Sequence, residues 1–175
     1  MPFGRLSPLQ EAVGLESITD GEFRRASYWS RFVERVDGLE IKDAAFTFRD
    51  ECGHEQTFTA PHVTGPVRRQ QAIAVDEFDF VRASTSQTPK TTLPSPPSMH
   101  FWRVDQGIDK AVYPDAKSYF TDLAAVYRQE IAALAAAGST YIQLDDVPFA
   151  MLCDPEVRAE VASKNIDPDQ LLQDY

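Results

Sequence analysis

Hydrophobic positions in the second half of the chain follow a helical spacing and then a strand-like run. Apolar side chains recur every three or four residues between positions 116 and 137, which predicts an amphipathic helix. Asp115 precedes it as an N-cap residue, and Gly138 follows as a stop signal. The run 140–144 then predicts a strand that ends at two acidic residues. The apolar positions of the helix are Phe120, Leu123, Tyr127, Ile131 and Leu134.

The same order of signals occurs near the N-terminus. Residues 7–13 suit a helix, Gly14 ends it, and a short strand at 15–19 leads to an acid. Units of helix, glycine, strand and acid build parallel sheets with helical crossovers. We therefore expect strands 15–19 and 140–144 to be parallel in one sheet, with the acids that follow them at the same edge.

The segments between these units predict further elements. A proline-rich stretch cannot continue a strand or a helix, and Asp167 followed by Pro168 marks a helix start. The expected elements are a helix at 23–36 ended by Gly38, a β-hairpin excursion at 44–60 with its turn at 51–54, strands at 78–83 and 90–93, and a loop at 94–98.

The fold class expected from this pattern is α/β, of the (β/α)8 barrel type. A complete barrel of this kind needs roughly 250 residues, whereas this chain has 175. We therefore expect an incomplete, truncated barrel that forms a single partial domain over residues 1–175. Such a sheet leaves an apolar flank exposed, which favours self-association.

Charge and cysteine content narrow the classes of function. The formal net charge is −10, from 17 Lys and Arg against 27 Asp and Glu. An acidic chain without a basic cluster argues against nucleic acid and anionic membranes as partners. Two separated cysteines, Cys52 and Cys153, do not form a disulfide framework, and we expect Cys153 to be buried. A cytoplasmic location is therefore expected.

Acidic residues at the strand ends are the first candidates for chemistry. They are Asp20, Glu22, Asp145 and Asp146. Strand ends face the active site in barrels, where carboxylates bind an ammonium group, hold a metal or move protons. The equally weighted alternative is that Asp20 or Asp146 caps the following helix.

Small polar and aromatic residues in the segment 94–102 are the second candidates, because a stiff loop of this composition can line a pocket. Ser95, His100 and Trp102 are its candidate pocket residues, and a rigid surface connection is the alternative. Cys52 and His54, with His62 nearby, are better explained by a hairpin turn than by a zinc site, since zinc needs three or four protein ligands.

Three motifs resemble, in the same order, those of cobalamin-independent methionine synthases. They are Thr19-Asp20-Gly21-Glu22-Phe23-Arg24-Arg25, Leu93-Pro94-Ser95-Pro96 and Tyr141-Ile142-Gln143-Leu144-Asp145-Asp146. The chain is most similar to the shorter, single-barrel methionine-synthase-like proteins of the uroporphyrinogen decarboxylase and methionine synthase superfamily. The resemblance covers residues 9–175, and residues 1–8 lie before it.

The resemblance implies a (β/α)8 barrel in which zinc binds a thiol substrate such as homocysteine. The thiolate then attacks the methyl group of a methylated folate or a similar donor. Glu22 matches a glutamate that helps hold the amino-acid substrate, and Asp145 matches the aspartate that binds the substrate ammonium. Both are therefore expected to be substrate-binding residues.

This sequence also departs from the family pattern. The family's zinc ligands begin with a His-x-Cys motif, which does not occur here, so we expect the isolated chain to bind zinc weakly or not at all. Asp146 replaces a glutamate, and Val147 precedes the proline that follows directly there. Three alternatives remain: an epoxide-opening coenzyme M alkyltransferase of the same superfamily, a metal-free barrel of the uroporphyrinogen decarboxylase type, and a non-catalytic chain.

Overall fold

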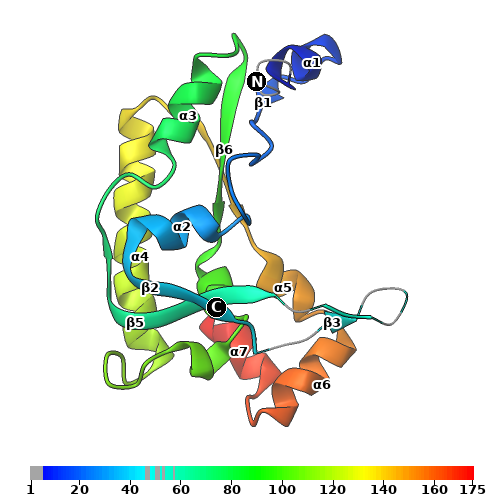
Figure 1. The fold of residues 1–175 in the computed structure, drawn as a ribbon, viewed down its shortest axis with the longest axis vertical. Helices are drawn as coiled ribbons and strands as arrows, with labels where there is room; N and C mark the ends of the chain where they lie inside the picture. Colours follow the sequence, from blue (N-terminus) through cyan, green and yellow to red (C-terminus); the bar gives the residue numbers. More distant parts are fainter. Residues whose placement is uncertain (1–5, 46–47, 50–51, 53, 57) are drawn as a thin grey trace.

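A three-stranded parallel sheet with the order β1-β6-β7 organises the chain (Figure 1). The structure is a computed structural model that describes residues 6–45, 48–49, 52, 54–56 and 58–175. The strands are β1 (Ser17–Ile18), β6 (Thr88–Pro94) and β7 (Tyr141–Asp145). The expected parallel arrangement of the first and last strands in one sheet is confirmed, with β6 between them.

Helices cover the sheet and continue the chain beyond it. The longest one, α4, matches the predicted amphipathic helix. It begins where the Asp115 carboxylate accepts the Ser118 N–H at 2.7 Å, and it is followed by Gly138 at φ +98°. The helices are α1 (Leu6–Ala12), α2 (Ser30–Arg35), α3 (Val75–Arg82), α4 (Ala116–Ala136), α5 (Val147–Met151), α6 (Pro155–Ser163) and α7 (Pro168–Asp174), with 3-10 turns η2 (Pro96–Met99) and η3 (Val104–Gly107).

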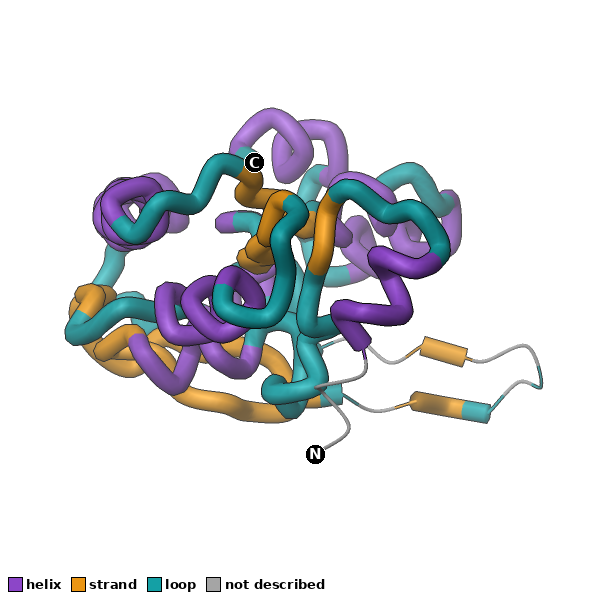
Figure 2. The backbone as a smooth tube through the Cα atoms, turned by 90° about the horizontal axis from the view of Figure 1, so that it is seen from above, coloured by secondary structure: helices purple, strands orange, loops and turns teal. Residues whose placement is uncertain are grey.

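An antiparallel ribbon formed by β2 (Val36–Asp43) and β5 (Thr59–Arg69) stands beside the parallel sheet. At its outer end a short hairpin of β3 (Phe48–Arg49) and β4 (Glu55–Gln56) extends away from the body of the molecule (Figure 2). The predicted hairpin is therefore confirmed, but the antiparallel pairing runs well beyond positions 44–60. Phe46, Glu51, Gly53 and Thr57, which were part of that prediction, lie outside the described residues.

Three predicted elements are wrong in type or extent. Residues 78–83, expected as a strand, belong to helix α3, because Phe78 and Val81 lie three apart and are buried on one helical face. The helix expected at 23–36 covers only Ser30–Arg35, and Phe23 is exposed. The loop expected at 94–98 contains a 3-10 turn from Pro96.

Gly38 was expected to end a helix, but it lies inside β2. The register of the ribbon shifts between Asp37 and Leu39, which marks an irregularity at this glycine. Its φ is +78°, and a Cβ atom here would collide with the backbone carbonyl groups of Gly65 and Pro66. The glycine therefore allows close approach of the two strands, which is a common reason for glycine inside a strand.

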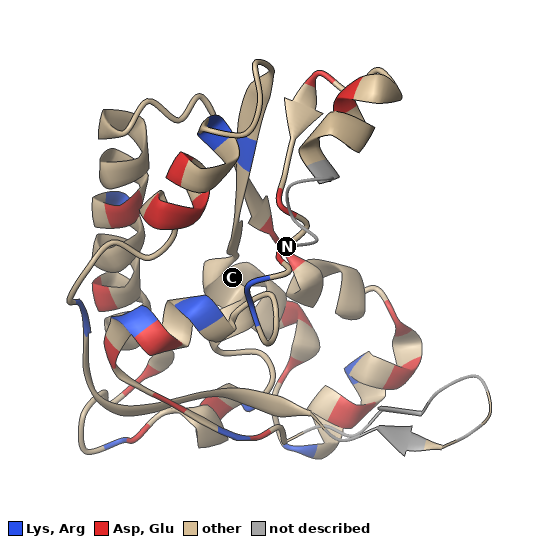
Figure 3. Ribbon diagram, turned by 45° about the horizontal axis from the view of Figure 1, so that its top comes forward, with Lys and Arg blue, Asp and Glu red and all other residues tan. Residues whose placement is uncertain are grey.

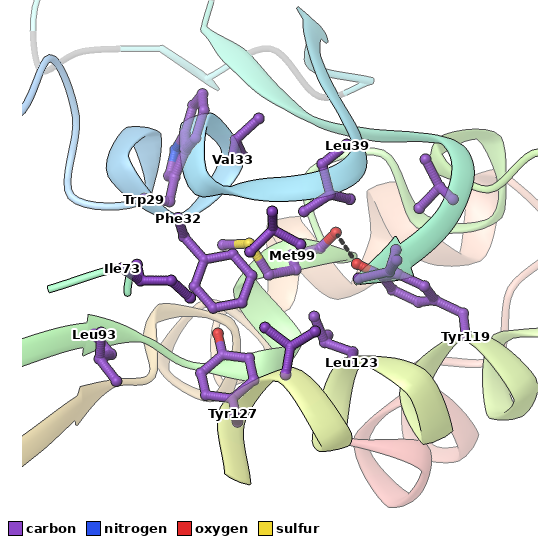
Figure 4. Packing of buried hydrophobic residues seen from close by; sticks show 14 of the residues in the cluster. Trp29, Phe32, Val33, Leu39, Ile73, Leu93, Met99, Tyr119, Leu123 and Tyr127 are labelled. Carbon is purple, nitrogen blue, oxygen red and sulfur yellow. Dashed lines mark hydrogen bonds between the residues drawn. The ribbon is translucent and has the colours of Figure 1, made fainter. Parts of the chain in front are cut away.

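The main hydrophobic core lies between the ribbon, the sheet and α4 (Figure 4). Phe32 of α2 stacks on Tyr127 of α4 with ring centroids 4.8 Å apart. The Tyr119 hydroxyl donates to the Met99 carbonyl oxygen at 3.2 Å, so α4 is also fixed to η2 by a buried hydrogen bond. A second cluster joins Phe101 and the start of η3 to the end of α5 and to α6 and α7. Its members are Phe101, Val104, Leu152, Val157, Val161 and Leu171.

Strand β7 lies at one edge of the parallel sheet and carries exposed apolar side chains. Tyr141, Leu144 and, just beyond the strand, Phe149 are each about two-fifths exposed or more. The expected exposed apolar flank is therefore present at this edge, while self-association stays a prediction. Within the described part of the chain, no helix is long and apolar enough to cross a membrane.

Candidate functional site

The loop after β1 holds Glu22 in a specific backbone conformation. Gly21 and Glu22 both have left-handed φ values, of 67° and 59°. The Asp20 carboxylate accepts the Glu22 N–H at 3.0 Å, which closes a tight turn. A non-glycine residue in this region is uncommon and often marks a functional position.

The carboxylate of Glu22 is fixed by two donors from different elements. Its Oε1 atom accepts a hydrogen bond from the Thr92 hydroxyl of β6 and another from Arg25 Nη1 at 3.2 Å. The side chain of Glu22 remains 24% exposed. Glu22 therefore lies at the C-terminal side of the sheet with its carboxylate oriented and accessible.

Arg25 lies at the centre of this arrangement, with a side chain that is 4% exposed. Its guanidinium donates to Glu77 of α3 through Nη2 at 2.6 Å and through Nε at 3.1 Å. Burial alone lowers the pKa of Arg25, but Glu77 and Glu22 outweigh that effect and raise the pKa above its ordinary value. The group therefore stays charged and acts as a permanent donor.

Charges of opposite sign continue from Arg25 toward the surface of α2 and α3. Arg31 lies 3.8 Å from Glu77 and also pairs with Asp76, which accepts a further bond from Arg35 at 3.0 Å. Figure 3 shows that both helices carry acidic and basic positions. The network alternates between acid and base from Glu22 to Arg35, which keeps its buried members paired.

The acids at the end of β7 differ in role. The Asp145 carboxylate accepts a hydrogen bond from Gln143 at 2.5 Å, and its backbone oxygen accepts the Ser95 N–H at 3.0 Å. Asp146 accepts the Phe149 N–H at 3.2 Å and caps α5. The helix-capping alternative therefore accounts for Asp146. Asp145 is the last residue of β7 and Glu22 follows β1, so both lie at the carboxyl ends of parallel strands of one sheet.

The three candidates of the proline-rich segment do not form one pocket. Ser95 is buried and caps η2, where its hydroxyl lies 3.1 Å from that of Ser98. His100 is buried, with Nδ1 2.8 Å from the Tyr175 hydroxyl, and burial lowers its pKa to about 4. Of the three, only Trp102 lines the aromatic groove that contains Tyr28 and Phe58.

This groove has a volume of about 320 Å³ and a mostly aromatic lining. It lies between the loop before α2, the start of β5 and Trp102, which contacts Phe58 edge-to-face with centroids 6.1 Å apart. Burial raises the pKa of Tyr28, with Ser98 and Trp102 opposing this and the charges of Asp145 and Asp146 adding to it. The lining residues are Ser27, Tyr28, Trp29, Phe58, Thr59 and Trp102.

The sequence-based interpretation missed Arg25, Glu77 and Thr92. Arg25 is part of the first family motif but was given no role there, and Glu77 directly precedes the segment 78–83 that was expected as a strand. A buried glutamate in the first turn of α3 is recognisable only once the helix is known. Cys153 was expected to be buried, but both it and Cys52 are exposed.

The resemblance implies zinc in the family, although this chain, which lacks the His-x-Cys motif, was expected to bind zinc weakly or not at all. Among the described residues, no group of three or more His, Cys, Asp and Glu side chains is arranged to hold a metal ion. These residues therefore do not fit a zinc site, and no zinc ligand is assigned to them.

The fold and the strand-end acids define an α/β chain with a polar site at the carboxyl edge of a parallel sheet. The family model of the cobalamin-independent synthase catalytic domain matches residues 6–165. The chain therefore belongs to this family, as its motifs predict. The uncharacterized protein YxjH of Bacillus subtilis (strain 168) is 32% identical over 170 residues, which cover 95% of this chain and 44% of YxjH.

Solved structures of methionine synthases share this architecture. A Listeria monocytogenes protein assigned as a vitamin-B12 independent methionine synthase matches with a TM-score of 0.72 and 31% identity, over 99% of this chain and 46% of that one. A B12-independent methionine synthase from Shewanella sp. W3-18-1, in complex with selenomethionine, matches with a TM-score of 0.65 and 28% identity, over 91% and 43%. This chain thus spans less than half the length of these relatives.

Proposed function

We propose that this chain supplies the amino-acid-binding part of a methyltransferase that moves a methyl group to the thiol of homocysteine or a similar thiol. The observation that carries the proposal is the orientation of Glu22 at the same sheet edge as Asp145. The three parallel strands would then be part of a (β/α)8 barrel, whose active sites lie at this edge.

Two carboxylates at one sheet edge suit an α-ammonium group. Hydrogen bonds between charged groups contribute about 1.5–3 kcal/mol each, and the accessible carboxylate of Glu22 is held ready to accept one. The Shewanella relative binds selenomethionine, an amino acid with such a group. The ammonium of the thiol substrate would lie between Glu22 and Asp145.

The aromatic groove supports a flat ring system as the second ligand. Aromatic side chains favour stacked or edge-to-face contact with other rings, and Trp102, Tyr28 and Phe58 line the groove. The charge of Asp145, at the end of β7, acts on the pKa of Tyr28. A methylated folate is the donor that this lining suits. Zinc, when bound in the family, favours the thiolate of the acceptor. The residues of this chain would bind and orient the amino acid.

Calorimetric titration of the purified chain with L-homocysteine tests the proposal. We expect saturable binding that weakens about tenfold or more in Glu22→Gln and in Asp145→Asn, because each loses a charged acceptor. Asp146→Asn is the matched control and should bind like the unaltered chain, since Asp146 caps α5. The absence of saturable binding, or equal binding by all variants, would contradict the proposal.

A further inference from the structure

We propose that Arg25 and Thr92 are positioning residues that hold one oxygen of Glu22 so that the other faces the ammonium group of the substrate. The inference rests on the proposed function and deepens it. The two Glu22 oxygens have different surroundings. Oε1 accepts from both Thr92 and Arg25, while Oε2 accepts no hydrogen bond from any described residue. A carboxylate held by one oxygen presents the other in a defined direction.

Arg25 is itself held too firmly to follow Glu22. Its guanidinium also donates to two backbone carbonyl oxygens, that of Thr92 at 2.9 Å and that of Tyr28 at 3.3 Å. Together with the two bonds to Glu77, these contacts come from the loop, α3 and β6. A donor fixed from three elements imposes its position on the exposed partner, so Glu22 adapts to Arg25.

Thr92 of β6 contacts both Arg25 and Glu22. Its carbonyl oxygen accepts from Arg25, and its hydroxyl donates to Glu22. Thr92 lies on the central strand β6, next to Gln143 of β7 in the register of the sheet. The hydrogen bond from Thr92 therefore fixes the carboxylate of Glu22 relative to β6. Strand β6 pairs with β7, and β7 ends at Asp145. This gives a physical reason for a fixed relation between the two carboxylates.

The backbone of Glu22 needs such support. A left-handed conformation at a residue with a side chain is strained and persists where the surroundings impose it. The Asp20 turn holds the N–H of Glu22, while Arg25 and Thr92 hold its side chain. The loop is thus preorganised before any ligand arrives, which reduces the ordering cost of binding.

Thr92→Val is the sharpest test, because valine keeps the shape and the strand preference of threonine while removing the hydroxyl. The matched control is Thr91→Val. Thr91 is the adjacent buried residue of β6, its hydroxyl has no partner among the described residues, and its side chain points to the other face. Thr92→Ser restores a hydroxyl.

Affinity for L-homocysteine and for 4-mercaptobutanoate, which lacks the amino group, is measured by calorimetry. The carbon-13 resonance of the Glu22 carboxyl group, assigned with Glu22→Gln, reports its surroundings.

We expect Thr92→Val to weaken homocysteine binding about three- to tenfold, as for the loss of one hydrogen bond. It should shift the Glu22 resonance and leave 4-mercaptobutanoate binding unchanged. Thr91→Val should change none of these, and Thr92→Ser should restore most of the affinity. Normal homocysteine binding by Thr92→Val, or an equal loss for both ligands, would overturn the positioning role alone. Failure of the unaltered chain to bind homocysteine would overturn the proposed function and this inference with it.

Discussion

Two buried polar regions of the molecule keep polar groups away from water in opposite ways. Around Arg25 and Glu77 the groups are charged, each side chain is 4% exposed, and every buried charge faces one of opposite sign. Around His100 the side chain is 2% exposed and is surrounded by the rings of Phe120 and Tyr175. Desolvation there favours the uncharged imidazole.

The difference between the two regions bears on the proposed ammonium site, because only one of them ends at an accessible carboxylate. The Arg25 network ends at Glu22, where a carboxylate is oriented and accessible. His100 carries no charge at neutral pH, and its Nδ1 is already bonded to Tyr175. The sequence placed His100 among the candidate pocket residues and Glu22 among the expected substrate-binding residues. In the structure His100 is buried and bonded to Tyr175, whereas the carboxylate of Glu22 is accessible.

Removing Glu77 breaks the charged region at its buried centre. Glu77→Ala leaves Arg25 buried without its main partner, and the loss of one member of a buried pair costs about 3–5 kcal/mol. Urea denaturation followed by circular dichroism measures the change in the free energy of unfolding. A loss below about 1 kcal/mol, the range of exposed pairs, would mean that solvent replaces Glu77 and that the network is not buried in solution.

Much of the fold follows from local signals in the sequence. The helix α4, its Asp115 cap and its glycine stop depend on neighbouring residues, so the sequence predicts them correctly. The parallel pairing was predicted because the helix, glycine, strand and acid signals occur twice. The strand expected at 78–83 is wrong in type. Phe78 and Phe80 alternate with Asp79 over only three residues, and burial of Phe78 and Val81 on one face selects the helix.

The candidate site was predictable only in part. Motif resemblance makes Glu22 and Asp145 the candidates, and both lie at the carboxyl ends of parallel strands. The residues that orient Glu22 come from three elements between positions 25 and 92. Long-range hydrogen bonds of this kind leave no periodic trace in a sequence. His100 shows the opposite case. Histidine is a common catalytic residue type, but burial keeps the imidazole of His100 uncharged.

The second region predicts a pH dependence of stability. In the unfolded chain His100 has a pKa near 6.5, whereas in the folded chain it is about 4. The unfolded state therefore binds more protons between these values, and folding stability falls as the pH is lowered from about 6.5 to about 4. The loss attributable to His100 amounts to at most about 3 kcal/mol.

Urea denaturation over this pH range, on the unaltered chain and on His100→Gln, measures that contribution. The variant should show a shallower fall in the free energy of unfolding. His62→Gln is the control, because this partly exposed histidine on β5 should leave most of the slope in place. Equal slopes for the unaltered chain and His100→Gln would show that His100 is hydrated in solution.

The exposed end of the charged network should matter least. Asp76 pairs with Arg31 and Arg35, but its side chain is 52% exposed. Exposed ion pairs contribute about 0.2–1 kcal/mol and are screened by salt. Asp76→Asn should therefore lower the free energy of unfolding by less than about 1 kcal/mol. This loss should shrink when the urea denaturation is repeated in 1 M NaCl, because the screening length is then about 3 Å. The cost of Glu77→Ala should persist in salt, because screening is weaker for buried pairs. If both variants lost their effect in salt, the gradient from a buried centre to a solvated end would be absent.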